Sequence, residues 1–238
     1  VICIRDITKD IELSEMKNEF ISLAAHELRT PITIIFGYTE LLLNGNIPEE
    51  TTKEVLLDVH KKSERLSLMI DDMLNLNNID TRSGKDFNIQ EMDISKAVAD
   101  AISSLAFPHD RLVMQPDGLA EISVLIDPVK FRLVIENIIS NAVKFSSSGA
   151  INISIVQATD ADSFVGVRIA DQGIGMNEEQ LLHIFDRFWQ GDKSGKHPGT
   201  GLGLSIVKEI VTIMGGKVEV ESVPDEGTTF TVWFQKPD

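Results

Sequence analysis

The sequence changes character once, near Thr81, and this change sets how many parts the chain folds into. Before it, glycine and proline are rare and apolar residues recur at helical spacing. After it, glycine clusters, alternating apolar runs and shorter helical patterns follow one another. Such a break predicts a helical domain followed by a mixed one. The second part, residues 87–238, is long enough to bury its own core.

Two long helices are expected in the first part. Residues 11–43 place apolar side chains on one broad face of a helix, which Asn44 and Gly45 end. Pro48 then begins a second helix that runs to about Ile79. Joined by a short loop, these helices form an antiparallel hairpin. One hairpin cannot bury both apolar faces, so we expect a homodimer in which two copies form a four-helix bundle.

The second part has the pattern of an α/β sandwich, a mixed sheet with one helical layer. Asp93 and Asp127-Pro128 are expected to begin helices, because aspartate caps a helix and proline suits its first turn. A further helix is expected over 204–214. Strand patterns, the last four forming two hairpins, cover residues 87–90, 151–156, 164–170, 218–221 and 230–234.

Charge and composition limit the partners. The net charge of −15 disfavours nucleic acid, whose backbone requires a basic surface. Cys3 is the single cysteine, which excludes an intrachain disulfide and a cysteine-only metal site. No segment reaches the ~18 consecutive apolar residues of a membrane span. We expect a cytoplasmic chain, in contact with a membrane only through segments outside it.

His26 is the candidate nucleophile of the first helix. It lies on the polar face, followed by Glu27 and, one turn on, by Thr30 and Pro31. A lone histidine on a helix is usually a plain surface residue. A proline inside a helical pattern, however, removes a hydrogen bond and kinks the helix, at a cost of about 3 kcal/mol. A kink beside an exposed histidine and a carboxylate suits a side chain that attacks an external phosphoryl donor.

Three polar residues share one face of the helix that begins at Pro128. Asn137, Asn141 and Lys144 are spaced by four and three residues along it. This face is either simply solvated or a binding site. Two amides and an ammonium could hold a hydrated Mg²⁺ and a phosphate oxygen, since Mg²⁺ prefers oxygen ligands and keeps most of its waters.

Two glycine-containing segments follow apolar runs. Asp171–Gly175 comes directly after a strand, and is either a turn or a carboxylate acceptor with backbone that can touch a base. Gly199–Gly203 leads into a helix, where free backbone N–H groups and the positive end of the dipole favour an anion. We interpret the polar residues 191–198 before it as a lid over a nucleotide.

Taken together, five segments occur in the order of the H, N, G1, F and G2 boxes of sensor histidine kinases of two-component systems, which this chain resembles. They are His26–Pro31, Asn137–Phe145, Asp171–Gly175, Phe185–Phe188 and Gly199–Leu204. The resemblance covers nearly the whole chain. It implies a dimerisation and phosphotransfer hairpin over 14–80, a linker over 81–86 and a Bergerat-type catalytic ATP-binding domain over 87–238.

The first residues carry a further resemblance. Ile4–Thr8 is similar to the exit strand of a PAS sensory domain. Residues 1–13 would then be a sensor-exit strand and coiled-coil linker. The sensor and any membrane span would lie upstream, and this chain would be the soluble part of a receptor.

The resemblance implies a role for each matching residue of the hairpin. His26 corresponds to the phosphoacceptor. Glu27 corresponds to the acidic neighbour that orients the imidazole or takes its proton. Thr30 corresponds to the residue that positions water when such proteins dephosphorylate their partner.

ATP and Mg²⁺ are the implied cofactors. Asn141 resembles the Mg²⁺ ligand and Asp171 the acceptor for the adenine amine. Many relatives have arginine after Trp189, where this chain has Gln190, so Arg187, Lys193 and Lys196 all stay candidates for the γ-phosphate. The full implied set of nucleotide-binding residues is Asn137, Asn141, Lys144, Asp171, Gly173, Gly175, Arg187, Phe188, Thr200, Gly201, Leu202 and Gly203.

The implied function is ATP-dependent autophosphorylation of His26 and transfer of the phosphoryl group to an aspartate on the receiver domain of a response regulator. Phosphatase activity on that regulator belongs to the same hypothesis. Two alternatives stay open: a kinase-silent dimeric signalling scaffold, or a protein that acts chiefly as a phosphatase. The intact boxes argue against silence, but sequence does not set the balance between kinase and phosphatase.

Overall fold

The computed structural model describes residues 8–45, 48–82, 86–105, 110–114, 122–158, 163–191 and 199–237. The chain divides into two compact units, Val1–Met73 and Leu74–Asp238, and each is described by itself. Residues 1–7 of the predicted sensor-exit strand and residues 192–198 of the predicted lid, with Lys193 and Lys196, lie outside the described residues. No described helix is long and apolar enough to cross a membrane.

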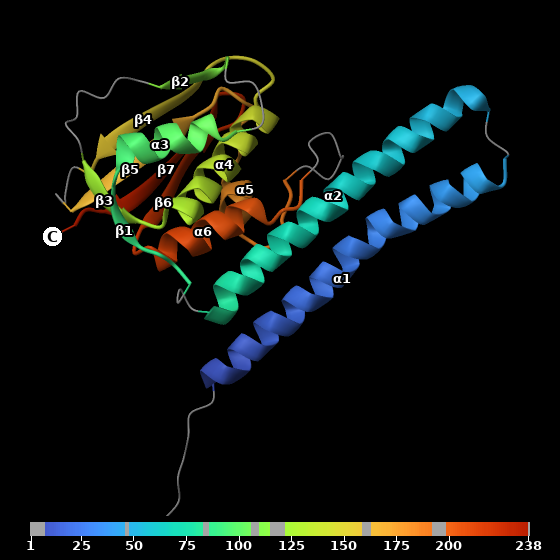
Figure 1. Ribbon diagram of the computed structural model, residues 1–238, viewed down its shortest axis with the longest axis horizontal. Coiled ribbons are helices and arrows are strands. Elements are labelled where there is room, and N and C mark those ends of the chain that lie inside the picture. Colours follow the sequence, from blue (N-terminus) through green and yellow to red (C-terminus); the bar gives the residue numbers. More distant parts are fainter. Residues whose placement is uncertain are drawn as a thin grey trace, which may run out of the picture. The chain divides into compact units, whose positions relative to one another are not determined.

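The first unit is built on α1 (Thr8–Leu43) and the greater part of α2 (Glu49–Arg82), two long helices that run in opposite directions (Figure 1); residues 74–82 of α2 belong to the second unit. Gly45, with φ of +66°, takes the left-handed conformation that suits the residue after a helix. The predicted hairpin is therefore confirmed. Helix α2 continues to Arg82, three residues beyond the predicted end, so the first two residues of the predicted linker are helical.

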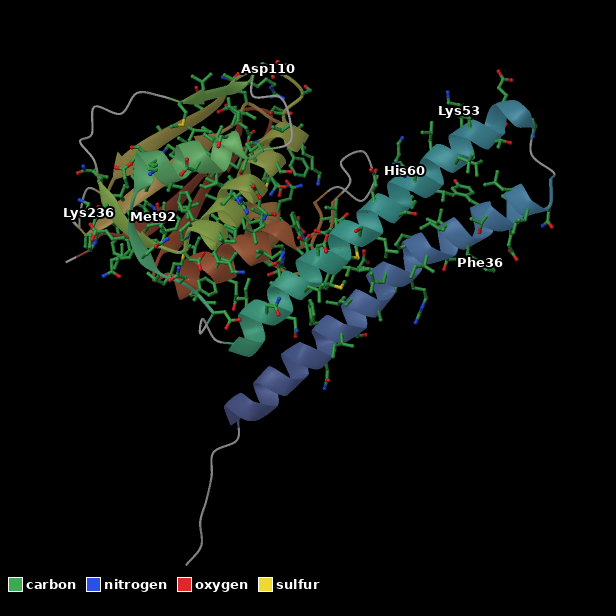
Figure 2. The ribbon with its side chains drawn as sticks, viewed as in Figure 1. Phe36, Lys53, His60, Met92, Asp110 and Lys236 are labelled. Atoms are coloured by element: carbon green, nitrogen blue, oxygen red, sulfur yellow. The ribbon has the colours of Figure 1, made fainter. Side chains whose placement is uncertain are left out.

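Pro31 is buried inside α1 and does not end it. Its ring nitrogen carries no hydrogen, so the Glu27 carbonyl loses its usual donor four residues on. The predicted apolar stripe of α1 is buried or half-buried, except at Leu23 and Leu41. A second apolar stripe, which the sequence analysis did not separate, is exposed. It consists of Ile21, Ile32, Phe36 and Leu43, and Figure 2 marks Phe36.

The second unit contains a five-stranded sheet in the order β2-β4-β5-β7-β6. The pairing β2–β4 is parallel and the other three are antiparallel, so the sheet is mixed, as predicted. A separate antiparallel pair joins β1 to β3. The strands are β1 (Gln90–Asp93), β2 (Leu112–Met114), β3 (Ser123–Ile126), β4 (Ile151–Gln157), β5 (Phe164–Ala170), β6 (Lys217–Val223) and β7 (Gly227–Gln235).

One helical layer covers a face of this sheet, as Figure 1 shows. It is made by α3 (Ile94–Ser103), α4 (Pro128–Phe145) and α6 (Gly203–Ile213); the short α5 (Glu178–His183) stands apart in sequence between β5 and α6. The core lies between the layers, where Ile138, Val167 and Val232 are fully buried. The predicted α/β sandwich is confirmed.

The helix starts follow local chemistry. Asp127 caps α4 by accepting hydrogen bonds from the backbone of Val129 and Lys130, and Pro128 occupies the first turn, as predicted. Asp93 caps α3 through the backbone N–H of Lys96 at 2.7 Å. The strand expected over 87–90 is instead β1, three residues later. The structure adds β2, β3 and α5, which were not predicted.

Candidate functional site

His26 presents its imidazole to solvent from α1, with 75% of the side chain exposed. Its Nδ1 lies 3.3 Å from Glu27 Oε1, whose side chain is 31% exposed. A carboxylate at Nδ1 favours the tautomer with the hydrogen on that nitrogen, which leaves the lone pair on Nε2. The structure therefore brings the predicted pair His26–Glu27 together. In this tautomer the Nε2 lone pair is available for nucleophilic attack.

Thr30 lies one helical turn from the histidine. Its hydroxyl donates to the backbone carbonyl of His26 at 3.4 Å, a long and weak contact. The side chain is exposed. The hydroxyl can therefore exchange this partner for a water beside the imidazole.

In the second unit, the polar face of α4 meets the glycine segment that precedes α6. The Asn137 amide nitrogen donates to Leu133 O at 2.8 Å, and its oxygen faces Gly203, where a Cβ would come within 2.5 Å. Lys144 Nζ faces Gly199, and a Cβ on that glycine would come within 2.5 Å of it. These predicted residues, distant in sequence, lie together.

Asn141 sits between them on the same face of α4. It is half-buried, and its amide makes no hydrogen bond to the described residues. The described part of the chain holds no cluster of three or more histidine, cysteine, aspartate or glutamate residues that could bind a metal. A cation here would therefore draw on the amide oxygen of Asn141, ligand phosphates and water, a donor set that suits Mg²⁺.

Asp171 follows the last residue of β5. Its Oδ1 accepts a hydrogen bond from Gly173 N at 2.8 Å, and its own backbone N–H donates to Thr228 O at 2.9 Å. Burial raises the pKa of the carboxyl above its ordinary value of 3.8. The backbone N–H groups of Gly173 and Thr228 and the charge of Arg111 act in the opposite direction and are outweighed. The result is a half-buried acceptor held in one orientation.

The two glycines after Asp171 touch the protein's own backbone. A Cβ on Gly173 would come within 2.5 Å of Phe145 O at the end of α4. Gly175 has φ of +60°, and a Cβ there would overlap the carbonyl of Val223. The sequence analysis explained both glycines by close approach to a ligand. The close approach in the structure is between protein segments, and their contact with a nucleotide stays a prediction.

The segment 199–203 is shaped by a second left-handed residue opposite it. Gly201 has φ of +75°, and a Cβ there would come within 2.6 Å of the Phe188 backbone, whose own φ is 64°. Thr200 Oγ1 accepts from Leu202 N at 3.2 Å, and Leu202 is fully buried. No side chain caps the start of α6. Its first backbone N–H groups therefore suit an anion.

Gln190 has a partner that the sequence analysis missed. Its Nε2 donates to Gly199 O at 3.0 Å, which ties the residues after α5 to the glycine segment. The sequence signal was only the replacement of an expected arginine. Arg187 and Phe188 are half-buried nearby in sequence, and the Phe185 ring lies 5.5 Å from Lys208 Nζ.

Family models match both parts of the chain. The His Kinase A (phospho-acceptor) domain matches residues 16–82, and the histidine kinase-, DNA gyrase B- and HSP90-like ATPase matches residues 126–238. The sensor histidine kinase WalK of Bacillus subtilis (strain 168) is 31% identical over 238 residues, which cover 97% of this chain and 38% of WalK.

Two solved structures have a similar fold. Full-length ShkA in complex with AMPPNP has a TM-score of 0.61 and 25% identity, over 92% of this chain and 46% of ShkA. The histidine kinase ThkA, solved with response regulator protein TrrA, has a TM-score of 0.73 and 21% identity, over 97% of this chain and 65% of ThkA. At this identity the likeness to ThkA is one of fold. The chain spans about two fifths of the length of WalK. The chain belongs to the histidine kinases, of which it comprises the phospho-acceptor hairpin and the ATPase domain.

Proposed function

We propose that this chain transfers the γ-phosphoryl group of ATP to His26 and then to an aspartate of a response regulator. The observation that carries the proposal is the imidazole of His26, exposed, paired through Nδ1 with Glu27 and unengaged at Nε2 by the described residues. A neutral imidazole in this tautomer is a competent nucleophile. The family of both parts supports the assignment.

The chemical step is simple to balance. The Nε2 lone pair forms a bond to the γ-phosphorus while the bond from that phosphorus to the bridging oxygen breaks, and ADP leaves with the electron pair. The phosphorylated ring is then cationic, and Glu27, 3.3 Å from Nδ1, stabilises it or takes the proton. The rest of the protein contributes position and charge, which dominate phosphoryl transfer.

The nucleotide is assigned to the second unit. The half-buried carboxylate of Asp171 accepts a hydrogen bond from the adenine amine. The phosphates are held at the uncapped start of α6 by Asn137, Lys144 and the segment Thr200–Gly203. Arg187 is a candidate for the γ-phosphate, beside Lys193 and Lys196, and Phe188 is expected at the nucleotide as an aromatic anchor of the lid. ShkA, a neighbour of the same fold, was solved with the ATP analogue AMPPNP, which supports this assignment.

Asn141 is assigned to the metal. When bound, Mg²⁺ neutralises charge on the phosphate oxygens and so assists their displacement. We expect Asn141→Ala to abolish autophosphorylation without unfolding the domain, whereas Asn152→Ala on β4 leaves it unchanged. Near-normal labelling of Asn141→Ala would refute the metal assignment.

A second copy of the chain is the proposed partner of the hairpin. Besides the exposed stripe of α1, α2 exposes Leu56, Ile70 and Leu74, which also share one side of their helix. Two copies would bury both sets in a four-helix bundle. We expect a dimeric mass in light scattering at micromolar concentration and a monomeric mass for Phe36→Glu. Leu182→Glu, which changes an exposed residue of α5, is the matched control.

The test of the main proposal uses γ-labelled ATP, Mg²⁺ and the two exposed histidines of the hairpin. We expect label that is lost in acid, stable in alkali and absent from His26→Ala. His60→Ala is the control, since His60 also pairs with a carboxylate at 3.3 Å, that of Glu64. Label that survives in His26→Ala would refute the acceptor. If the chain binds ATP and no label forms, the kinase-silent scaffold becomes the better-supported hypothesis.

Phosphatase activity is assigned to Thr30. Its exposed hydroxyl stands one turn from His26 and is held only by a 3.4 Å contact. Thr30→Ala is expected to keep autophosphorylation and slow dephosphorylation of the regulator. Thr33→Ala removes a similar hydroxyl, bonded to Arg29 O at 2.9 Å, and is expected to change neither rate. Equal phosphatase rates for the two variants would contradict the role of Thr30.

The response regulator is the proposed acceptor of the phosphoryl group. ThkA was solved with its response regulator protein TrrA, which supports docking of such a partner on this fold. A phosphorylated receiver aspartate, detected after mixing labelled chain with candidate regulators, would identify the partner.

A further inference from the structure

We propose that Arg111, in the turn just before β2, is a positioning residue of the nucleotide site and sets the place and charge of the adenine acceptor Asp171. This inference rests on the proposed ATP site. Nothing in the pattern of the sequence singled out Arg111, which stands beside Asp110 (labelled in Figure 2) and outside all five boxes.

The guanidinium of Arg111 binds the five-residue loop, residues 146–150, that follows α4. Nε donates to Gly149 O at 2.9 Å, and Nη1 donates to Ser146 O at 3.0 Å. Nη2 donates to Ser146 Oγ at 2.6 Å and to Ser148 O at 3.1 Å. All three guanidinium nitrogens are therefore engaged with one loop, a geometry that the planar arginine fork provides and lysine does not.

The same loop and the end of α4 carry the segment that follows Asp171. Ile174 N donates to Phe145 O at 3.2 Å, and Gly173 lies so close to this carbonyl that a Cβ would come within 2.5 Å. Gly149 faces Gln172 Oε1, at 2.6 Å from a Cβ. A shift of the loop would therefore move the residues that follow Asp171, and with them the Gly173 N–H that the carboxylate accepts.

Arg111 also acts on Asp171 by charge. Burial raises the pKa of Asp171, and the positive charge of Arg111 is the side-chain influence that opposes it, beside the backbone N–H groups of Gly173 and Thr228. Loss of the charge would raise this pKa further. A protonated carboxyl accepts a hydrogen bond less well, so adenine binding would weaken first at acidic pH.

The two actions can be separated by two substitutions. Arg111→Gln removes the charge and most of the fork, whereas Arg111→Lys keeps the charge and loses the fork. Arg132→Gln is the matched control, because Arg132 is on α4 and its one ion pair with a described residue is to Glu136 of the same helix, at 3.7 Å. Tryptophan fluorescence in a denaturant titration is used to check that each variant is folded before binding is measured.

The experiment measures ATP and GTP binding to the full chain by calorimetry from pH 5 to pH 8, and the titration of the Asp171 carboxyl by NMR without nucleotide. For Arg111→Gln we expect ATP affinity to fall about tenfold, a smaller loss for GTP, and a higher pH midpoint for both binding and titration. For Arg111→Lys we expect weaker binding with an unchanged midpoint.

Two results would overturn the inference. One is wild-type ATP affinity in Arg111→Gln. The other is an equal loss of affinity for ATP and GTP with no change in the titration of Asp171, since this would mean that Arg111 only stabilises the loop. If the wild-type chain itself fails to bind ATP, the proposed function is wrong; the NMR titration, which needs no nucleotide, then still decides whether Arg111 controls Asp171.

Discussion

The two units differ in how firmly the surrounding fold holds their candidate functional side chains. In the hairpin, the His26 side chain is three-quarters exposed and its imidazole pairs, among the described residues, with Glu27 alone at 3.3 Å, while apolar side chains such as Phe36 are exposed to solvent. In the second unit, Asp171, Asn137 and Lys144 rest on a core of fully buried side chains and on glycines packed against backbone.

This difference shows which unit is complete within one chain. The second unit buries a core of its own between sheet and helices, so the residues of its site are held by contacts within the fold. The hairpin leaves an apolar face without a partner among the described residues, so its stability is expected to depend on a second copy. If His26 is the nucleophile as proposed, its exposure on such a support leaves it open to two different partners, a phosphoryl donor and a receiver domain.

The largest expected effect contrasts two phenylalanines. Phe131 is 1% exposed, and its ring centroid lies 5.1 Å from that of Phe234, whereas Phe36 is 61% exposed. Phe131→Ala is expected to cost the second unit about 3–5 kcal/mol through lost burial and a cavity. Phe36→Ala is expected to leave that unit unchanged and to weaken the dimer.

Both outcomes can be measured in the intact chain. Trp189 and Trp233 are its two tryptophans and both belong to the second unit, so their fluorescence follows the unfolding of that unit in denaturant. Light scattering follows the dimer. A large loss of fluorescence-detected stability in Phe36→Ala would break the comparison, because the two units would then share one folding transition.

A smaller effect separates two helix caps. Asp127 is 5% exposed and accepts three backbone hydrogen bonds: two from α4 and one at 2.8 Å from Asn88 N. Asp127→Ala removes the cap and strands the Asn88 donor, at an expected cost of about 2–4 kcal/mol. Asp93→Ala removes one such bond and is expected to cost about 1 kcal/mol. Equal losses in denaturant titrations would show that the contact to Asn88 contributes nothing.

These caps also show which parts of the fold a single sequence reveals. Asp127 and Pro128 are adjacent, so their helix start was predictable from local chemistry alone. The same holds for the β6–β7 hairpin, where alternation and a turn lie within one stretch. The α5 helix was missed although Asn177 and Gln180 form a capping box, a signal that was present in the sequence.

Other features depend on contacts that no local pattern encodes. The three-residue strand β2 exists because it pairs in parallel with β4, and three residues are too few for a periodic signal. The box motifs predicted that Lys144 and Gly199 belong to one site, but not that Gln190 ties Gly199 in place. Arg111 carried no signal, because its partners lie more than 30 residues away.

The next prediction separates binding from folding within the second unit. The folded-state pKa of Asp171 is raised, so the ionised carboxylate costs stability at any pH above that value, and the cost disappears as pH falls below the ordinary value of 3.8. Asp171→Asn is expected to abolish ATP binding while unfolding free energy at pH 7 equals or exceeds that of the wild type.

The control for this prediction is pH. The advantage of Asp171→Asn should shrink between pH 7 and pH 4, measured by urea unfolding without nucleotide. A variant that is less stable at pH 7 would show that the ionised carboxylate is a net structural support, and the contrast between a costly site residue and its stabilising surroundings would fail.

The smallest expected effect has the opposite sign and lies on the sheet. Glu219 accepts hydrogen bonds from Lys217 Nζ at 2.8 Å and Trp233 Nε1 at 2.7 Å, and these lower its pKa. A lowered folded-state pKa gives stability that is present above the ordinary value of 4.5 and is lost as pH falls through the folded value. Because the pair with Lys217 is about half exposed, Glu219→Gln is expected to cost well under about 1 kcal/mol at pH 7. This deficit should vanish as pH falls from 4.5 through the lowered folded-state pKa of Glu219, whereas Asp171→Asn should lose its advantage as pH falls from the raised folded-state pKa of Asp171 to 3.8. If both variants moved in the same direction with pH, the two carboxylates would not differ in kind, and burial at Asp171 could no longer be held to serve binding at the expense of stability.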